Sequence, residues 1–281
     1  MKNTVRSILI LSLVSIFLMA CSSDDTEPES TGNKFSAPTI NGKRLVKIKQ
    51  GDTFTSLEYN SQGQVSKVKH HSKDGTIREN SYWYEDRRVI WSPYEHIYNI
   101  SNGYAVECNF TALTSDDENA MTVECQESYL YDAQGCLLKA IKPPYDFAEE
   151  GPINEIYNYT WKDGNIISVT EKTSRETIIL SENTEFIINY TTIENTIPLF
   201  FIYYYSNNLY LEWQGYFGKR CKNLPLSVTF INHTMEPSWD GYSTTYHYSY
   251  TVEDGLITKI AVESTTNKGI SSKDTYELEW W

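Results

Sequence analysis

The sequence predicts an all-β protein: a single domain built as an antiparallel meander of aromatic-rich hairpins that form a large twisted sheet, a sandwich or an open barrel. Aromatic content, alternation of residue types and an internal repeat lead to this prediction. The 281-residue chain contains 22 Tyr, 7 Trp and 10 Phe, residues that suit a pleated, half-buried surface. Apolar and polar residues alternate in segments such as 45–49, 246–250 and 256–260, and sustained helical periodicity is missing.

The internal repeat supports the same fold class. Four segments combine an aromatic strand, a polar turn ending in glycine and an aliphatic strand, and they cover residues 57–68, 129–141, 157–169 and 248–260. Asp163-Gly164 is a strong hairpin indicator, because such turns need the positive φ that glycine adopts without steric cost. A degenerate fifth copy covers residues 81–91. Irregular spacing between the copies predicts a meander of hairpins and not a solenoid.

The amino terminus has the features of a lipoprotein signal peptide. Lys2 and Arg6 precede an apolar run, 8–20, which is shorter than the roughly 20 apolar residues that a transmembrane helix needs. The run ends at Cys21, and the small Ala20 before this cysteine resembles a lipobox. We therefore expect cleavage before Cys21 and acylation of this residue. The alternative is an ordinary cleaved signal that happens to contain a cysteine.

Three parts are expected along the chain: a signal peptide at 1–20, the acylated Cys21 with a flexible acidic tether at 21–38, and an all-β domain at 39–281. The tether has too little apolar surface to offset the entropy cost of ordering it. A serine after Cys21 favours sorting to the outer membrane. The acidic run 22–27 resembles an export tag for the cell surface, and a solvated tether is its alternative interpretation.

Three segments carry a resemblance to a known family. Tyr59 to Gly63 and Tyr131 to Gly135 resemble the YD repeats of Rhs-type proteins, and residues 215–225 are similar to a segment of uncharacterised Bacteroides surface lipoproteins. The resemblance implies an extracellular meander of β-hairpins in which glycines set the turns and tyrosines fill the faces. It implies no catalytic residue.

Charge and motifs narrow the possible functions. The net charge of −13 repels nucleic-acid phosphates and anionic lipid, so we expect no nucleic-acid partner and membrane contact only through the lipid anchor. CxxC, HExxH, GxSxG and P-loop motifs are absent from the sequence, and we expect no catalytic residue, no metal and no cofactor. His70 and His71 are adjacent on an expected strand, so they point to opposite faces and do not share a metal. The acidic pairs at 116–118 and 149–150 are expected to be solvated loops.

The densest aromatic stretch, residues 200–217, is the best candidate for a binding surface. Within it, residues 200–205 are expected to form a strand buried on both faces. Trp213 and Tyr216 lie outside this run and beside glycines, so we expect them to form an aromatic ligand surface. The predicted function is a non-catalytic cell-surface lipoprotein that binds a glycan or a protein. The alternatives are a glycosidase-like extracellular hydrolase without a recognisable motif and a structural component of the envelope.

Cysteine spacing predicts one disulfide. Four cysteines remain once Cys21 is acylated, and an extracellular location permits them to pair. Residues 104–110 and 121–126 alternate in polarity, and a hairpin centred between Asp116 and Asp117 sets Cys108 opposite Cys125. We therefore expect a disulfide between these two cysteines, with two facing free thiols as the alternative. The sequence gives no basis for deciding whether Cys136 and Cys221 pair.

Overall fold

The computed structural model describes residues 35–93, 95–113, 122–143, 153–175, 178–198, 209–233 and 241–281, all within one compact unit, Asn33–Trp281. In this part of the chain there are one short helix, α1 (Leu209–Trp213), and sixteen strands. The strands are β1 (Leu45–Gln50), β2 (Thr53–Tyr59), β3 (Val65–His71), β4 (Ile77–Tyr84), β5 (Arg88–Ser92), β6 (His96–Ser101), β7 (Tyr104–Leu113), β8 (Thr122–Tyr131), β9 (Leu137–Lys142), β10 (Ile153–Lys162), β11 (Asn165–Arg175), β12 (Ile178–Glu194), β13 (Asn223–Asn232), β14 (Ser243–Glu253), β15 (Leu256–Thr266) and β16 (Ser271–Trp280). No helix among the described residues is long and apolar enough to cross a membrane.

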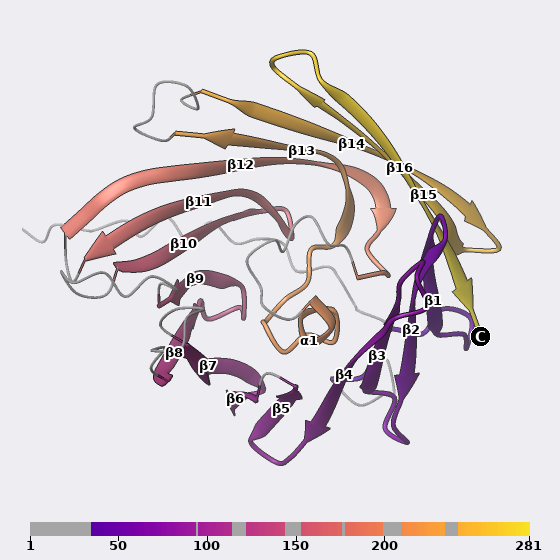
Figure 1. Ribbon diagram of the computed structural model, residues 1–281, viewed down its shortest axis with the longest axis horizontal. Coiled ribbons are helices and arrows are strands. Elements are labelled where there is room, and N and C mark those ends of the chain that lie inside the picture. The colour runs from indigo at the N-terminus through magenta and orange to yellow at the C-terminus, as the bar shows by residue number, and fades with distance from the viewer. Residues whose placement is uncertain are drawn as a thin grey trace, which may run out of the picture. The chain divides into compact units, whose positions relative to one another are not determined.

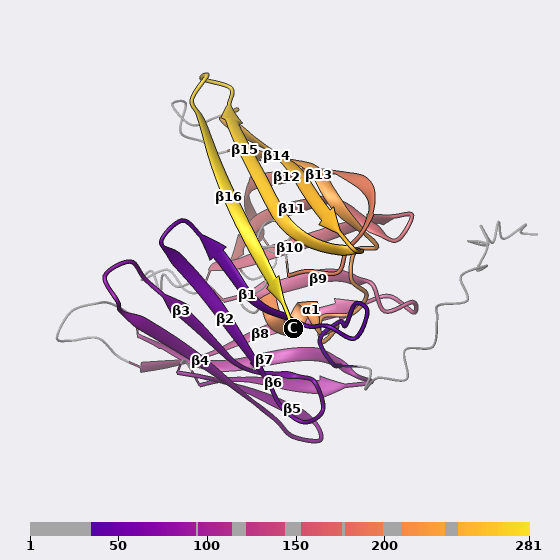
Figure 2. The ribbon, with the colours of Figure 1, turned by 90° about the vertical axis from the view of Figure 1, so that its right-hand side faces the viewer.

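The strands form one antiparallel sheet that closes into a barrel (Figure 1). Each strand pairs with the next one along the chain, and β16 returns to pair with β1, where Ile48 lies opposite Leu278 (Figure 2). The predicted all-β antiparallel meander is therefore confirmed. The sheet is not an open barrel, since the pairing of β16 with β1 leaves neither strand as a free edge.

The predicted repeats are the hairpins β2–β3, β8–β9, β10–β11 and β14–β15, and the degenerate copy is the hairpin β4–β5. In the first copy the Asn60 Oδ1 atom accepts hydrogen bonds from the backbone N–H groups of Gln62 and Gln64, each at 3.0 Å. Asp132 accepts the equivalent pair in the second copy. The YD-like sequence is thus a turn closed by an Asn or Asp side chain.

A tyrosine or tryptophan joins neighbouring hairpins at one end of the barrel. Between β1 and β2 the ladder ends at the pair Lys47–Ser56, and beyond it the Tyr59 hydroxyl donates a hydrogen bond to the Leu45 carbonyl. Eight described strand pairs join an odd-numbered strand to the even-numbered strand that follows it. Seven of them have this hydrogen bond: the donor lies three residues after the last ladder pair on the even-numbered strand, and the acceptor lies two residues before it on the odd-numbered strand. We call these contacts the aromatic bridges; donor first, they are Tyr59–Leu45, Tyr84–Val65, Tyr131–Ala105, Trp161–Leu137, Tyr190–Ile166, Tyr250–Pro225 and Trp280–Ile257.

The aromatic bridges compensate for a local separation of the hairpins. Because the ladder between successive hairpins stops short of this end, each accepting carbonyl has lost its partner on the neighbouring strand, and a buried carbonyl without a hydrogen bond is costly. A side-chain donor restores that bond. Burial raises the pKa of the Tyr131 hydroxyl well above its ordinary value, so this hydroxyl remains protonated and donates at neutral pH.

The wall has an apolar inner face, and across β15, β16 and β1–β4 its outer face carries Lys–Glu ion pairs. Leu57, Val68 and Tyr98 point inward and are at most 5% exposed. Glu58, Lys67 and Lys69 alternate with Leu57 and Val68 on the outer face, where Lys47 pairs with Glu279 at 2.9 Å. Since strand side chains alternate between the two faces, the apolar core lies inside the barrel.

We expect Tyr131→Phe to lower the free energy of unfolding by about 1–3 kcal/mol, the cost of leaving the buried Ala105 carbonyl without a hydrogen bond. Urea unfolding followed by circular dichroism measures the change. Tyr242→Phe, which alters a partly exposed tyrosine outside the strands, is the control and should change stability by less than about 0.5 kcal/mol. Equal effects of the two substitutions would contradict a structural role for the bridge.

Candidate functional site

The candidate site is a hollow in the wall between β3 and β4. The ladder between these strands runs from the pair His71–Ile77 to the pair Lys67–Ser81 and then stops. Beyond that point Tyr82, Trp83 and Tyr84 continue to pair with β5 only, so β3 and β4 separate. The separation opens a hollow of about 490 Å³ at the end of the barrel that carries the aromatic bridges.

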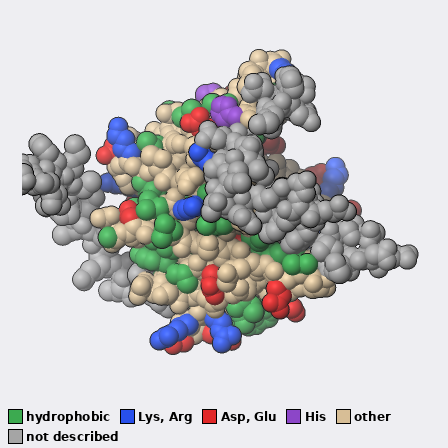
Figure 3. Space-filling view, turned by 90° about the vertical axis from the view of Figure 1, so that its left-hand side faces the viewer, with side chains coloured by type: hydrophobic (Ala, Val, Ile, Leu, Met, Phe, Trp, Pro, Cys, Tyr) green, Lys and Arg blue, Asp and Glu red, His purple; other side chains and the backbone are tan. Residues whose placement is uncertain are grey.

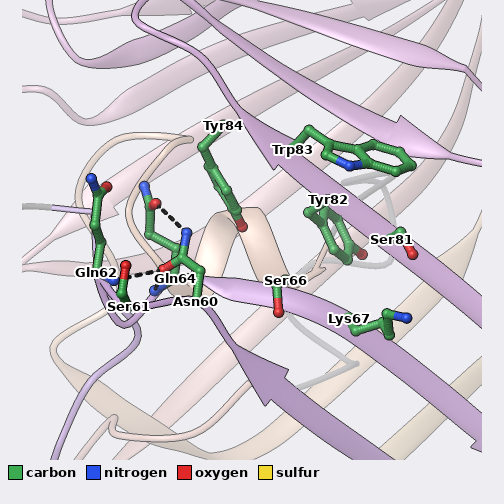
Figure 4. Close-up of a pocket in the computed structure, with 10 residues that line it drawn as sticks. All are labelled: Asn60, Ser61, Gln62, Gln64, Ser66, Lys67, Ser81, Tyr82, Trp83 and Tyr84. Carbon is green, nitrogen blue, oxygen red and sulfur yellow. Dashed lines mark hydrogen bonds between the residues drawn. The ribbon is translucent and has the colours of Figure 1, made fainter.

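Neutral polar side chains and aromatic rings line this hollow (Figure 4). In Figure 4 the amide groups of Asn60 and Gln64 lie on one side, joined by hydrogen bonds, and the Trp83 indole lies on the other. Trp83 is 52% exposed and lies directly opposite Ile90 on β5. The lining residues are Asn60, Ser61, Gln62, Gln64, Ser66, Lys67, Ser81, Tyr82, Trp83 and Tyr84.

Ser66 distinguishes this strand pair from most of the others. We call the residue that follows the accepting carbonyl the gap residue. At five of the other six bridged pairs it is aliphatic: Val46, Val106, Leu138, Ile167 and Leu226. At β3 it is Ser66, the extra residue of a β-bulge, since Glu58 pairs with Lys67 and Tyr59 with Val65. A small polar residue therefore stands where five of the other six pairs carry a larger apolar one, and the sixth carries Thr258.

The electrostatic environment of the hollow is nearly neutral. Lys67 is the one charged residue in its lining, and the Lys67 Nζ atom lies 2.9 Å from the Glu79 Oε1 atom. The hydrogen bond from Lys67 lowers the pKa of Glu79 below its ordinary value, so the carboxylate stays ionised. The charge of Lys67 is thus balanced by an adjacent anion.

The inner side of the hollow rests on a plug, which we define as residues 209–222: α1 and the turns that follow it. Figure 1 shows α1 enclosed by the strands. The Gln214 Oε1 atom accepts a 2.9 Å hydrogen bond from the Val65 N–H group, and its Nε2 atom donates to the Tyr84 hydroxyl at 3.0 Å. The Gln64 Nε2 atom donates to the Tyr216 hydroxyl at 2.9 Å. The plug therefore satisfies backbone and side-chain groups that the separation of β3 and β4 exposes.

The same plug contacts the wall on its other sides. The Phe217 ring packs edge-on against Tyr129 at a centroid distance of 4.9 Å, and the Ile166 N–H group donates to the Cys221 sulfur at 3.4 Å. Gly218 approaches the turn of the second repeat so closely that a Cβ atom there would lie 2.3 Å from the Gly135 carbonyl oxygen. The plug is thus part of the hydrophobic core.

The charged side chains that are buried in the barrel interior do not line the hollow. Glu127 is 1% exposed and accepts a hydrogen bond from the Tyr129 hydroxyl, and Lys142 is 6% exposed. Burial lowers the pKa of Lys142, and the nearby carboxylates of Glu127 and Glu155 oppose that shift. Within the described residues no group of three or more His, Cys, Asp or Glu side chains is arranged to hold a metal ion.

The aromatic surface expected at Trp213 and Tyr216 is not present. Trp213 is 3% exposed and Tyr216 is 4% exposed, because both belong to the plug, where the Phe35 ring stacks on Tyr216 at 4.7 Å. That prediction was wrong. Residues 200–205 and Cys21 lie outside the described residues, as do the acidic pairs at 116–118 and 149–150.

The predicted disulfide between Cys108 and Cys125 is not formed, and Cys136 and Cys221 are also free. The predicted hairpin is present as β7–β8, and both cysteines are buried on its inner face as expected. The register differs by two residues, however: Cys108 lies opposite Glu127 and Cys125 opposite Phe110. A shift of two residues preserves the alternation of faces, so the polarity pattern could not distinguish these registers.

The adjacent histidines on β3 point to opposite faces, as the sequence predicted, and each contacts its own partner on β2. The His70 Nδ1 atom is 2.9 Å from the Thr55 hydroxyl. His71 stacks on Phe54 with ring centroids 4.0 Å apart. The residues of the hollow, in contrast, were not predicted as a site. One sequence pattern pointed to a residue of the hollow. In the run Tyr82-Trp83-Tyr84, side chains of a strand alternate between faces, so Trp83 must face away from its two neighbours.

We expect Gly218→Ala to destabilise the barrel by about 1–3 kcal/mol more than Gly269→Ala. Both glycines have positive φ, +89° and +80°, so both substitutions introduce backbone strain, but an added Cβ at Gly269 meets nothing within 4 Å. The difference between the two variants therefore isolates the packing of the plug. Urea denaturation midpoints measure it, and equal midpoints would show that the plug does not pack as described.

Comparison with solved structures identifies similar folds. A porin-like protein from Bacteroides uniformis superposes with a TM-score of 0.57 at 15% sequence identity, over 88% of this chain and 100% of the other. A porin-like protein from Bacteroides vulgatus gives a TM-score of 0.56 at 14% identity, over 84% of this chain and 97% of the other. No protein-family model and no curated protein matches the sequence. At these identities the likeness establishes a shared all-β barrel fold and no more.

Proposed function

We propose that this chain is a non-catalytic recognition protein of the outer membrane, anchored by acylated Cys21, whose barrel stands in water outside the bilayer. Its role is to present a binding site on a rigid wall. The polarity of that wall is the observation that carries the proposal.

The outer face of the barrel is charged across several consecutive strands. Lys–Glu ion pairs cross from β15 to β16, from β16 to β1 and from β2 through β3 to β4, and they are Lys273–Glu263, Lys47–Glu279, Lys49–Glu277, Lys69–Glu58 and Lys67–Glu79. On the face drawn in Figure 3, charged side chains lie among the hydrophobic ones. A lysine at the middle of a membrane-spanning barrel wall costs about 2–4 kcal/mol. This arrangement therefore favours water on the outside.

The inner face supports the same orientation. Membrane-spanning barrels are apolar outside and polar inside, whereas here Leu45, Val65 and Ile257 are buried inward at no more than 2% exposure. The plug adds Leu211 and Phe217 to this core. Barrel and plug together have the polarity of a protein that folds in water, so the expected lipid anchor supplies the attachment to the membrane.

The proposed location at the outer membrane is supported by the amino-terminal sequence and by the comparisons. The lipobox-like sequence at Ala20-Cys21 supports acylation, and the fold shared with porin-like Bacteroides proteins is consistent with an envelope location. Because no catalytic motif was found in the sequence, recognition is the function that these observations favour over hydrolysis.

A chain that begins at residue 22 should fold and remain monodisperse in buffer without detergent, because its outer face is polar. Size-exclusion chromatography and thermal unfolding with and without detergent measure this, and we expect the same melting temperature in both. Planar-bilayer recordings should detect no conductance. Folding that requires detergent or lipid would overturn the proposal.

In cells, Cys21→Ala should abolish acylation and leave an unacylated precursor, whereas Cys136→Ala, a matched change at a partly exposed cysteine, should leave the protein lipidated. Mass spectrometry of the mature amino terminus measures the outcome. A mature protein that begins elsewhere and carries no diacylglycerol on Cys21 would contradict the proposed anchor.

A further inference from the structure

We propose that the hollow between β3 and β4 is a carbohydrate-binding site that takes a neutral pyranose unit of a glycan against the Trp83 indole. This inference rests on the proposed recognition function and names its site and ligand class. One of the seven bridged strand pairs differs from the others at the place where a hollow has formed.

Two residues distinguish this pair: Trp83 sets it apart from all six others, and Ser66 from five of them. The gap residue is Ser66, where five of the others have valine, leucine or isoleucine and the last has Thr258. The even-numbered strand carries Trp83 one residue before its bridging tyrosine, and the equivalent residues of the other pairs are Glu58, Leu130, Thr160, Asn189, Ser249 and Glu279. The fold does not require either residue, since the same geometry is built six times without them. Positions that break a local rule are expected to serve function.

The chemistry of the lining fits a sugar. A pyranose has a face of C–H groups that packs on an aromatic ring and a rim of hydroxyls that both donate and accept hydrogen bonds. Trp83 offers a half-exposed indole beside Ile90. Serine hydroxyls around it both donate and accept, and no hydrogen bond within the described residues uses the hydroxyls of Ser61 and Ser66.

The charge of the site favours a neutral ligand. Lys67 is paired with Glu79 at 2.9 Å, and the Ser81 hydroxyl donates to the same carboxylate at 3.3 Å. The chain carries a net charge of −13, so its field disfavours an anionic glycan. A sulfated or sialylated sugar would meet no uncompensated cation in this lining.

The polar groups are held in place before a ligand arrives. Gln64 is fixed between Asn60, at 2.8 Å, and the plug residue Tyr216, at 2.9 Å. The Tyr84 hydroxyl donates to the Val65 carbonyl at 2.6 Å and receives a hydrogen bond from Gln214. Pre-ordered side chains lower the entropy cost of binding, and the volume of about 490 Å³ lies within the range of small-ligand sites.

The test uses the lipid-free chain from residue 22, provided that it folds without detergent as expected above. An array of neutral gluco-, manno-, xylo- and galacto-oligosaccharides, with sulfated and sialylated glycans beside them, selects probes for isothermal titration calorimetry. We expect a neutral oligosaccharide to bind and Trp83→Ala to weaken it at least tenfold. Trp281→Ala, at an 89% exposed tryptophan that does not line the hollow, should change affinity less than twofold.

A second pair of variants tests the gap without removing an aromatic ring. Ser66→Val fills the hollow with the residue type found at the other strand pairs, so we expect it to keep the melting temperature and abolish binding. Thr258→Val makes the same kind of change at the equivalent position of β15 and should leave binding intact. Because both variants follow the pattern of the fold, loss of structure is not expected to obscure the result.

Three results would overturn the assignment: no array glycan binding the folded wild-type chain, binding that survives both Trp83→Ala and Ser66→Val, or a preference for anionic glycans. Each leaves the recognition function standing if the barrel still folds in buffer. Failure of the chain to fold without detergent would instead contradict the proposed function itself, so the two failures are distinguishable.

Discussion

The structure depends on filling a wide barrel whose inner face is apolar. Eight strands enclose an interior that wall side chains fill alone, whereas about sixteen enclose a wide lumen. This barrel has sixteen strands, and its inward side chains are buried because residues 209–222 enter the lumen and pack against them. The hydrogen bonds of Gln214 and Tyr216 fix this plug to the ends of the strands. Without the plug, much of the core would contact water.

Local features of this fold were accessible from the sequence, and long-range ones were not. The hairpins followed from alternation and from turns such as Asp163-Gly164, because both depend on neighbouring residues. Closure of β16 on β1 joins residues far apart in the chain, and local periodicity carries no information about it. Burial of Trp213 and Tyr216 could not be predicted for the same reason, since it depends on a plug enclosed by strands from both halves of the chain. The Cys108–Cys125 register failed because polarity specifies a face and not a position along it.

The repeat acquires a physical meaning in the barrel. The tyrosine of each YD-like copy is a hydrogen-bond donor that joins successive hairpins where their ladder stops, and seven such aromatic bridges hold one end of the wall together. A scaffold built from equivalent units tolerates variation in one of them, and the unit at β3–β4 carries Ser66 and Trp83 where a hollow opens. The likeness to porin-like proteins concerns the fold, and function resides in sites and surfaces that a shared fold does not determine.

Native-state hydrogen exchange tests most directly whether the plug is an integral part of the core. The backbone N–H groups of Val65 and Ala105 bind plug atoms, and those of Lys219 and Lys222 bind carbonyls of the wall turns. If the plug is core, these amides should exchange only through global unfolding, with the same free energy as amides at the centres of β11 and β15. Exchange through a local opening that costs several kcal/mol less would show that the plug leaves the lumen independently, and it would contradict this account.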